Sequence, residues 1–132
     1  MPWVEVFAAF LVCHLAGDFL LQTDWQAKHK RRGLAGDPVS RRALLSHIAT
    51  YTLAFVPALV WIADEAGGWV VAVAALISLP HMVQDDGRLL ERYIAKVKGP
   101  EAGSQLVVAT AVDQSFHVVA MFLLALAVGE WA

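Results

Sequence analysis

Four long apolar runs dominate the chain, at approximately residues 3–24, 43–63, 68–90 and 105–129. Each run is long enough to cross the hydrocarbon core of a bilayer as a helix, which takes roughly 20 residues. The runs are continuous and rich in Ala and Leu, without the alternation of apolar and polar residues that is typical of an outer-membrane strand. The pattern therefore predicts an all-α polytopic membrane protein, a four-transmembrane-helix bundle that forms one domain over residues 1–132.

The composition agrees with this prediction. Hydrophobic residues make up 58% of the chain and charged residues 17%, whereas about a quarter of the residues of a soluble domain are charged. The first run lacks the basic segment and small-residue cleavage site of a signal peptide in the right order, so we expect it to be retained as a span. Cys13 is the single cysteine, which excludes an intrachain disulfide and a zinc motif built on cysteines. Pro80 lies in the third run and predicts a bend there, because proline removes a backbone donor.

The basic residues are confined to two connections between the runs, residues 25–42 and 91–104, and their borders. They are Lys28, Lys30, Arg31, Arg32, Arg41, Arg42, Arg88, Arg92, Lys96 and Lys98. The connection between the second and third runs carries Asp64 and Glu65 instead. Under the positive-inside rule both basic connections are cytoplasmic and both termini lie outside. We expect the basic residues to face anionic lipid and not nucleic acid, because membrane topology explains their distribution fully.

Seven ionisable residues interrupt the apolar runs at similar depth. Each run has one histidine, and three of these four histidines have an aspartate four positions away, on the same helix face. Counted from the basic end of each run, all seven lie within a slab on the order of 10 Å thick. An aspartate at the centre of a membrane helix costs about 2.5 to 3.5 kcal/mol. Histidine–aspartate pairing could offset some of that cost, but the joint pattern favours a metal shell made of His14, Asp18, His47, His81, Asp85, Asp113 and His117.

The HxxxD motif of the first run, at His14 and Asp18, recurs about 67 residues later at His81 and Asp85. Such a recurrence is compatible with two pseudo-repeated helical hairpins related by an axis along the membrane normal. Seven ligands exceed the needs of one tetrahedral zinc, so we expect one or two divalent transition-metal ions, with zinc favoured over iron or manganese. Haem is less favoured, because carboxylates adjoin every candidate axial pair.

Further polar residues flank the predicted shell. Gln22, Asp24 and Lys28 continue the face of Asp18 at roughly helical spacing, and Asp24 could equally be an exposed residue at a helix end. Tyr51 follows His47 by one turn and could donate a hydrogen bond or simply pack. We assign as neighbours of the shell or as substrate contacts Gln22, Asp24, Lys28, Tyr51 and Gln114.

Four segments of the chain, HLAGDFLLQTDWQAKHK, LLSHIATYT, HMVQD and DQSFH, resemble a bacterial family of small integral membrane proteins, domain of unknown function 3307. The resemblance covers nearly the whole chain, and the first segment is the most specific. It implies a four-helix protein, which we expect in the bacterial inner (cytoplasmic) membrane, and it supplies no activity. The sequence departs from the family pattern around Pro80 and residues 86–88. The family's polar positions are matched by His14, Asp18, Gln22, Asp24, His47, His81, Asp85, Asp113 and His117.

The leading functional hypothesis is a membrane-embedded, metal-dependent hydrolase that acts on a lipid or lipid-linked ester or phosphate. A metal activates water and polarises the substrate oxygen, and Asp18 or Asp113 could serve as general base. The expected partner is membrane lipid, and a homo-oligomer is allowed. The first alternative is a transporter of transition-metal ions or protons, which the apolar outer half of every run disfavours. The second is a haem-binding or non-catalytic membrane protein.

Overall fold

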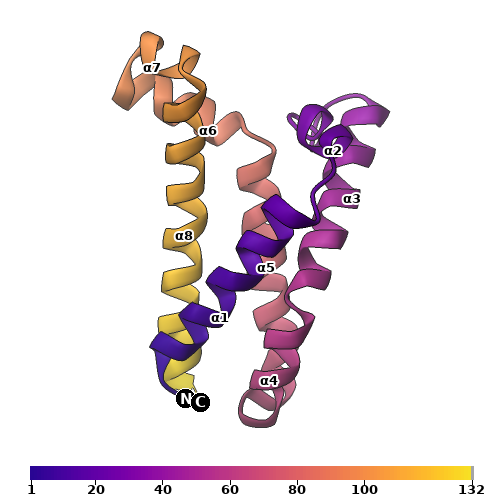
Figure 1. Cartoon of the computed structure of the whole chain (residues 1–132), viewed down its shortest axis with the longest axis vertical. Helices are drawn as coiled ribbons and strands as arrows, with labels where there is room; N and C mark the ends of the chain where they lie inside the picture. The colour runs from indigo at the N-terminus through magenta and orange to yellow at the C-terminus, as the bar shows by residue number, and fades with distance from the viewer. Residues whose placement is uncertain (132) are drawn as a thin grey trace.

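The computed structural model describes residues 1–131, with side chains through residue 130, and every regular element in that part of the chain is a helix (Figure 1). Short helices occupy the polar connections: α2 (Asp24–His29), α6 (Arg88–Tyr93) and α7 (Pro100–Ser104). The predicted all-α class is therefore confirmed. The long apolar runs form α1 (Trp3–Leu15), α3 (Pro38–Ala54), α4 (Val56–Ala66), α5 (Val70–Asp85) and α8 (Leu106–Trp131).

Three helical segments among the described residues are long and apolar enough to cross a membrane: Trp3–Leu20, Val56–Asp85 and Leu106–Glu130. The second of these segments contains a reversal of the chain. It joins α4 to α5 through the 3₁₀ turn Gly67–Trp69, where Gly67 has a φ of 53° that a residue with a side chain rarely adopts. Oγ1 of Thr52 in α3 lies 2.8 Å from Oγ of Ser78 in α5, and Nε2 of His47 lies 3.2 Å from that of His81. These two helices therefore run side by side in opposite directions.

The break in the second apolar run falls at Phe55, between α3 and α4. Pro57 lies in the first turn of α4, where its missing N–H costs nothing, but the same residue cannot continue the hydrogen bonding of α3. In contrast, α5 continues through Pro80 as one helix. The predicted run 43–63 is thus divided at Phe55 between α3 and α4. The predicted run 68–90 is not interrupted at Pro80, but α5 ends at Asp85 and α6 begins at Arg88.

The connections at the basic end are ordered by helix caps. The side chain of Asp37 accepts hydrogen bonds from the backbone N–H groups of Val39 and Ser40 and so caps α3. The bonds from the backbone and hydroxyl of Ser40, followed by that from Val39, hold the pKa of Asp37 below its usual value. Thr23 and Gln26 form a reciprocal capping box at the start of α2. These caps fix the residues at which α2 and α3 begin, and so separate each helix from the segment before it.

The two ends of the bundle differ in content (Figure 1). Both termini and the α4–α5 turn lie at one end, and α2, α6 and α7 lie at the other. The apolar core occupies the half nearer the termini and includes Val6, Phe10, Phe55, Ile62 and Val128, all at most 2% exposed. The buried histidines and aspartates that the structure describes belong to the other half, where the functional candidates gather.

Candidate metal centre

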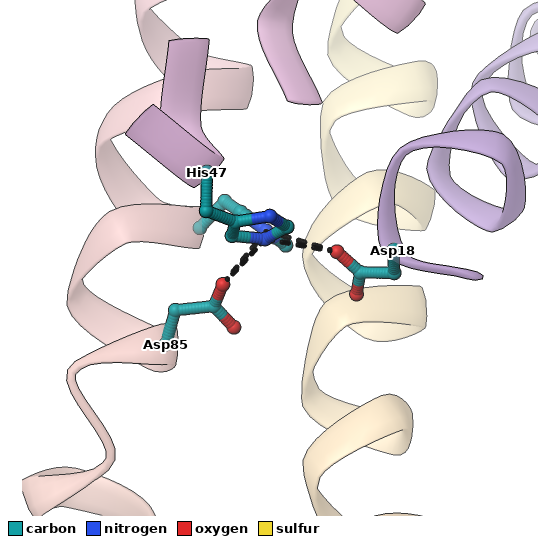
Figure 2. A group of neighbouring side chains, drawn as sticks. Asp18, His47 and Asp85 are labelled. Carbon is teal, nitrogen blue, oxygen red and sulfur yellow. Dashed lines mark hydrogen bonds and ion pairs between the residues drawn. The ribbon is translucent and has the colours of Figure 1, made fainter. Parts of the chain in front are cut away.

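Two histidines and two aspartates from three helical segments converge at one point. We call them the primary cluster, and they are Asp18, His47, His81 and Asp85. One ligand atom from each lies within 4.8 Å of all the others, and all four residues are buried. Nε2 of His47 is 3.3 Å from Oδ1 of Asp18 and 2.8 Å from Oδ2 of Asp85 (Figure 2). Nε2 of His81 lies 3.2 Å from Nε2 of His47, 3.3 Å from the same oxygen of Asp18 and 3.2 Å from that of Asp85.

These separations are close to the edges of a metal tetrahedron. Zinc binds histidine nitrogen and carboxylate oxygen at about 2.0 to 2.2 Å, so the ligand atoms of a tetrahedral site lie about 3.3 to 3.6 Å apart. The measured values of 2.8 to 3.3 Å fall at or slightly below this range. Oδ1 of Asp18 is buried and has no hydrogen-bond partner among the described residues. A cation at the centre of the primary cluster would satisfy this oxygen.

A second group of possible ligands adjoins the primary cluster. It consists of Asp85, Asp113 and His117. Nε2 of His117 lies 3.4 Å from Oδ1 of Asp85 and 3.7 Å from Oδ2 of Asp113, and no group in the described chain forms a hydrogen bond with it. Because Oδ2 of Asp85 faces the primary cluster and Oδ1 faces His117, this carboxylate lies between the two groups. Asp113 is the most accessible of these residues, with its side chain 25% exposed.

The end of α1 is shaped to bring Asp18 inward. A π-helical turn, η1 (Ala16–Leu20), follows α1 and closes with a hydrogen bond of 2.9 Å from the N–H of Leu21 to the carbonyl of Ala16. A Cβ atom on Gly17 would lie 2.6 Å from Cδ2 of Tyr51, so only glycine allows this close approach to α3. The ring of Tyr51 in turn stacks on His81, with centroids 3.5 Å apart and planes 7° apart. The turn and the tyrosine together fix the rings and carboxylates of the primary cluster.

His14 lies beside the primary cluster and outside both groups. Its Nε2 is 2.9 Å from Oε1 of Gln114, an oxygen that only accepts, so Nε2 donates. Its Nδ1, 3.0 Å from the hydroxyl of Tyr51, therefore accepts from that hydroxyl. Gln114 then donates to Oδ2 of Asp18 over 3.3 Å, which leaves Oδ1 of Asp18 directed at the primary cluster. Both ring nitrogens of His14 are thus engaged away from the centre, and its predicted role as a ligand stays a prediction.

The structure brings together six of the seven predicted ligands, all except His14. Two of the predicted neighbours, Tyr51 and Gln114, form the hydrogen bonds just described. Gln22 donates to the carbonyl of Asp18 over 3.2 Å, and its own Oε1 is buried without a partner in the described chain. Asp24 and Lys28 pair with each other at 2.7 Å on the exposed face of α2. The helical face predicted to link them to Asp18 ends at Leu20, because Thr23 caps a new helix.

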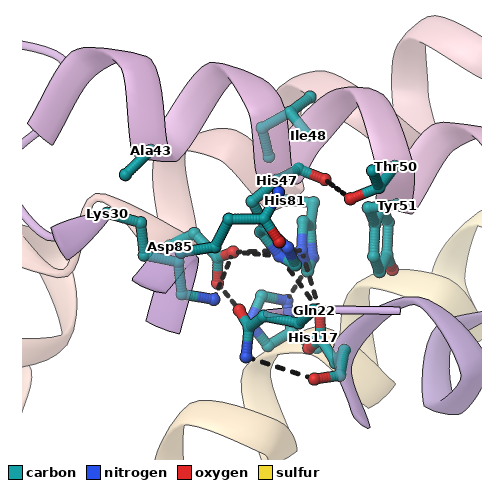
Figure 3. Close-up of polar contacts among 12 residues, drawn as sticks. Gln22, Lys30, Ala43, His47, Ile48, Thr50, Tyr51, His81, Asp85 and His117 are labelled. Atoms are coloured by element: carbon teal, nitrogen blue, oxygen red, sulfur yellow. Dashed lines mark hydrogen bonds and ion pairs between the residues drawn. The ribbon is translucent and has the colours of Figure 1, made fainter. Parts of the chain in front are cut away.

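Lys30 is a part of the site that sequence reasoning missed. Its Nζ lies 2.7 Å from Oδ2 of Asp85, and its side chain is 14% exposed (Figure 3). Asp86 holds this connection in place, because its carbonyl accepts from the N–H of Arg32 and its carboxylate from the N–H of Leu34. Lys30 and Asp85 are 55 positions apart, and no local pattern signals their contact. Lys30 is the one cation that the described chain places against the primary cluster.

One family comparison bears on this site. The DUF3307 family, described as a protein of unknown function, matches residues 6–131 and so includes every residue of the primary cluster. No curated protein and no solved structure matches the chain.

Proposed function

The chain belongs to the DUF3307 family, and we propose that it is an integral membrane protein with a metal-dependent hydrolytic site for a lipid or lipid-linked ester or phosphate. The observation that carries this proposal is the primary cluster, in which four buried ligand atoms from three helical segments have a spacing close to that of a tetrahedral metal site. A buried group of carboxylates and imidazoles is costly in a membrane unless a cation compensates it.

The primary cluster has an excess of negative charge, which favours a bound cation. Asp18 and Asp85 bring two negative charges to the primary cluster, and Lys30 brings one positive charge. Two imidazoles with two carboxylates suit zinc, and iron or manganese are the alternatives. A second ion would be held by His117 and Asp85, whose two oxygens face the two positions, with Asp113 beside it. When bound, a divalent ion would polarise a substrate oxygen and lower the pKa of a water molecule.

The two candidate general bases differ in their surroundings. Asp18 is 5% exposed and receives a hydrogen bond from Gln114, so we assign it to holding the metal. Asp113 is more exposed and lies at the edge of the second group, where substrate and water could reach it. We therefore assign to Asp113 the role of accepting the proton of the attacking water. A closed set of four ligands beside a more open position is compatible with a structural metal next to a reactive one.

We further propose four membrane crossings: α1 with η1, α3 with α4, α5, and α8. The arrangement in Figure 1 supports this, because these segments run between one end with the termini and another with the basic connections. The basic end would face the cytoplasm of a bacterium and both termini would lie outside the inner membrane. The metal site would then lie in the cytoplasmic half of the bilayer, within reach of lipid head groups.

The packing argues against the alternatives. A transporter needs a polar path to the other side, whereas Phe10, Phe55 and Ile62 fill the bundle there and are 0% exposed. A bis-histidine haem needs the macrocycle between two imidazoles, whereas the Nδ1 atoms of His81 and His117 lie 3.0 Å apart. A transporter and a haem protein would both need the helices to separate, whereas a non-catalytic membrane protein would not.

The test is elemental analysis of purified protein, together with release of product from vesicles of phospholipid and lipid-phosphate esters. We expect one or two equivalents of metal, and hydrolysis that a chelator abolishes and added metal restores. Protein that retains metal yet releases nothing from either class of lipid would contradict a hydrolase. Metal flux in proteoliposomes that His81→Ala abolishes would show a transporter instead.

A further inference from the structure

We propose that a groove between α8 and the segment of α6 and η3 (Ile94–Lys98) binds an acyl chain of a membrane phospholipid and presents its polar part to the Asp113 side of the metal centre. This inference rests on the proposed function and adds to it the substrate class and the route of entry. The substrate would enter sideways from the bilayer, without crossing the protein.

The groove has the size and lining of a site for a hydrocarbon chain. Its volume is about 470 Å³, within the range of roughly 300 to 1,000 Å³ that is usual for small-molecule sites. Its α8 wall runs from Val107 to Val119, which is about 18 Å of helix at 1.5 Å per residue. Most of this wall consists of valine, alanine and phenylalanine side chains, so an apolar chain could lie along it without desolvating polar groups.

One cation stands at the end of the groove that faces the basic connections. Among the described side chains that line the groove, only Lys98 is charged, and Tyr93 lies on the same wall. Lys98 ends η3, the segment between α6 and α7, and lines the groove together with Val107 near the start of α8. Helices α6 and α7 lie at the end where we expect the lipid head groups (Figure 1). A single cation above an apolar groove complements the phosphate of a phospholipid with its chain below. A water-soluble phosphate would gain nothing from the valine wall, so the observations favour a membrane lipid.

The groove adjoins the metal centre at Phe116. This side chain lines both the groove and a second cavity of about 130 Å³, whose other walls include Gln84, Leu90 and Asp113. The ring of Phe116 meets Tyr93 edge to face, with centroids 5.0 Å apart, and its carbonyl accepts a hydrogen bond of 3.3 Å from Gln84. Asp113 therefore lines a cavity that shares one wall, Phe116, with the groove. A lipid in the groove has its ester and phosphate groups on the side of the bundle where the proposed base is accessible.

The test uses full-length protein in nanodiscs that contain phosphatidylglycerol with a photoreactive diazirine in one acyl chain. Ala111→Trp would fill the groove, and Thr110→Trp places the same side chain on an exposed position of α8 that does not line it. We expect Ala111→Trp to reduce crosslinking to residues 107–119 about tenfold and Thr110→Trp to leave it unchanged. A second pair is Lys98→Glu and Lys96→Glu, both exposed in η3, of which only Lys98 lines the groove. We expect a several-fold loss from the first and none from the second.

Metal content and hydrolysis are measured on the same samples, so that the two proposals fail separately. Protein without metal or activity that still loses crosslinking in Ala111→Trp would refute the proposed function and support the groove. Metal-loaded, active protein in which Ala111→Trp and Thr110→Trp crosslink equally and have the same KM would overturn the groove. Crosslinking that joins the groove to a second copy of the chain, with none to lipid, would also overturn it.

Discussion

The two HxxxD motifs have the same spacing and different roles. In α5 both residues join the primary cluster, with Nε2 of His81 3.2 Å from Oδ2 of Asp85. In the first motif, which we call the α1 motif, His14 lies in α1 and Asp18 in η1. Only Asp18 joins the primary cluster, and Nδ1 of His14 lies 3.7 Å from Oδ2 of Asp18. The difference comes from the partners: Tyr51 and Gln114 engage both ring nitrogens of His14. Spacing along a helix predicts which side chains share a face, but partners on other helices select which atoms face the centre.

The largest effect should come from the α5 motif. His81→Ala and Asp85→Asn should each lower the metal content of purified protein to less than a tenth of wild type, because each removes a ligand and Asp85 also serves the second group. Elemental analysis measures this directly. The matched control is Asp86→Asn, the same change at a neighbouring buried carboxylate that bonds to the Leu34 N–H. Equal metal loss in the control would mean that the variants only disturb the fold.

The α1 motif should respond more weakly. His14→Ala should reduce metal affinity about 10- to 100-fold and leave the stoichiometry unchanged at saturating metal, as is usual for residues that orient ligands. Tyr51→Phe removes only the hydroxyl bonded to His14 and should have a smaller effect in the same direction. Titration against a competing chelator gives both affinities. If His14→Ala abolished binding as completely as His81→Ala, the two motifs would be equivalent and His14 would be a ligand.

Of the two HxxxD motifs, only that of α5 forms an ion pair with Lys30 in the described chain. The lysine should therefore compete with a metal for Asp85. Its Nζ lies 2.7 Å from Oδ2 of Asp85, the oxygen that also faces the primary cluster. A hydrogen bond to a charged group contributes about 1.5 to 3 kcal/mol. When a metal displaces Lys30, its ammonium group regains part of this energy by bonding to water. We expect Lys30→Met to raise metal affinity on the order of fivefold. The control is Lys28→Met, which removes an exposed pair with Asp24. A drop in affinity for Lys30→Met would show that the lysine supports the metal site.

The smallest effect should come from a hydrogen bond between α3 and α5 that lies outside the primary cluster. Thr52 and Ser78 join α3 to α5 through hydroxyls 2.8 Å apart. Such bonds between membrane helices average about 0.6 kcal/mol, so Ser78→Ala should lower the free energy of unfolding by about that amount and leave metal affinity unchanged. Unfolding in mixed micelles and chelator titration measure the two quantities. A change in metal affinity here would show that the α3–α5 contact as a whole controls the site.

Much of the fold could be predicted because its signals are local. Hydropathy located the helical runs, and clusters of glycine and charge located the connections. The break at Phe55 was not predicted, although Pro57 was its signal. The prediction placed a bend at Pro80 instead. Both are prolines in apolar runs, but Pro57 begins a helix and Pro80 lies inside one. Which proline interrupts a helix depends on the packing around it, which a single sequence does not show.

The candidate site was predictable for a different reason. Ionisable residues in apolar runs are costly, so their presence marked the site, and six of the seven residues came together. Their individual roles were not predictable. The partner of His14 is Gln114, 100 positions away, and the partner of Asp85 is Lys30, 55 positions away. The sequence shows which residues must avoid lipid, but it does not show which nitrogen or oxygen each one turns toward.

The π-turn at the end of α1 has a consequence for comparing relatives of this protein. Val6, Phe10, His14 and Asp18 are four residues apart, and in a regular α-helix each such step turns the side chain about 40° past a full rotation. The wider turn offsets part of that drift, so Asp18 stays in line with the buried stripe. A single insertion or deletion between Ala16 and Asp18 would leave hydropathy nearly unchanged and rotate Asp18 by about 100° relative to α1. Alignments of this segment should therefore be anchored on Asp18 itself rather than on the ends of the span.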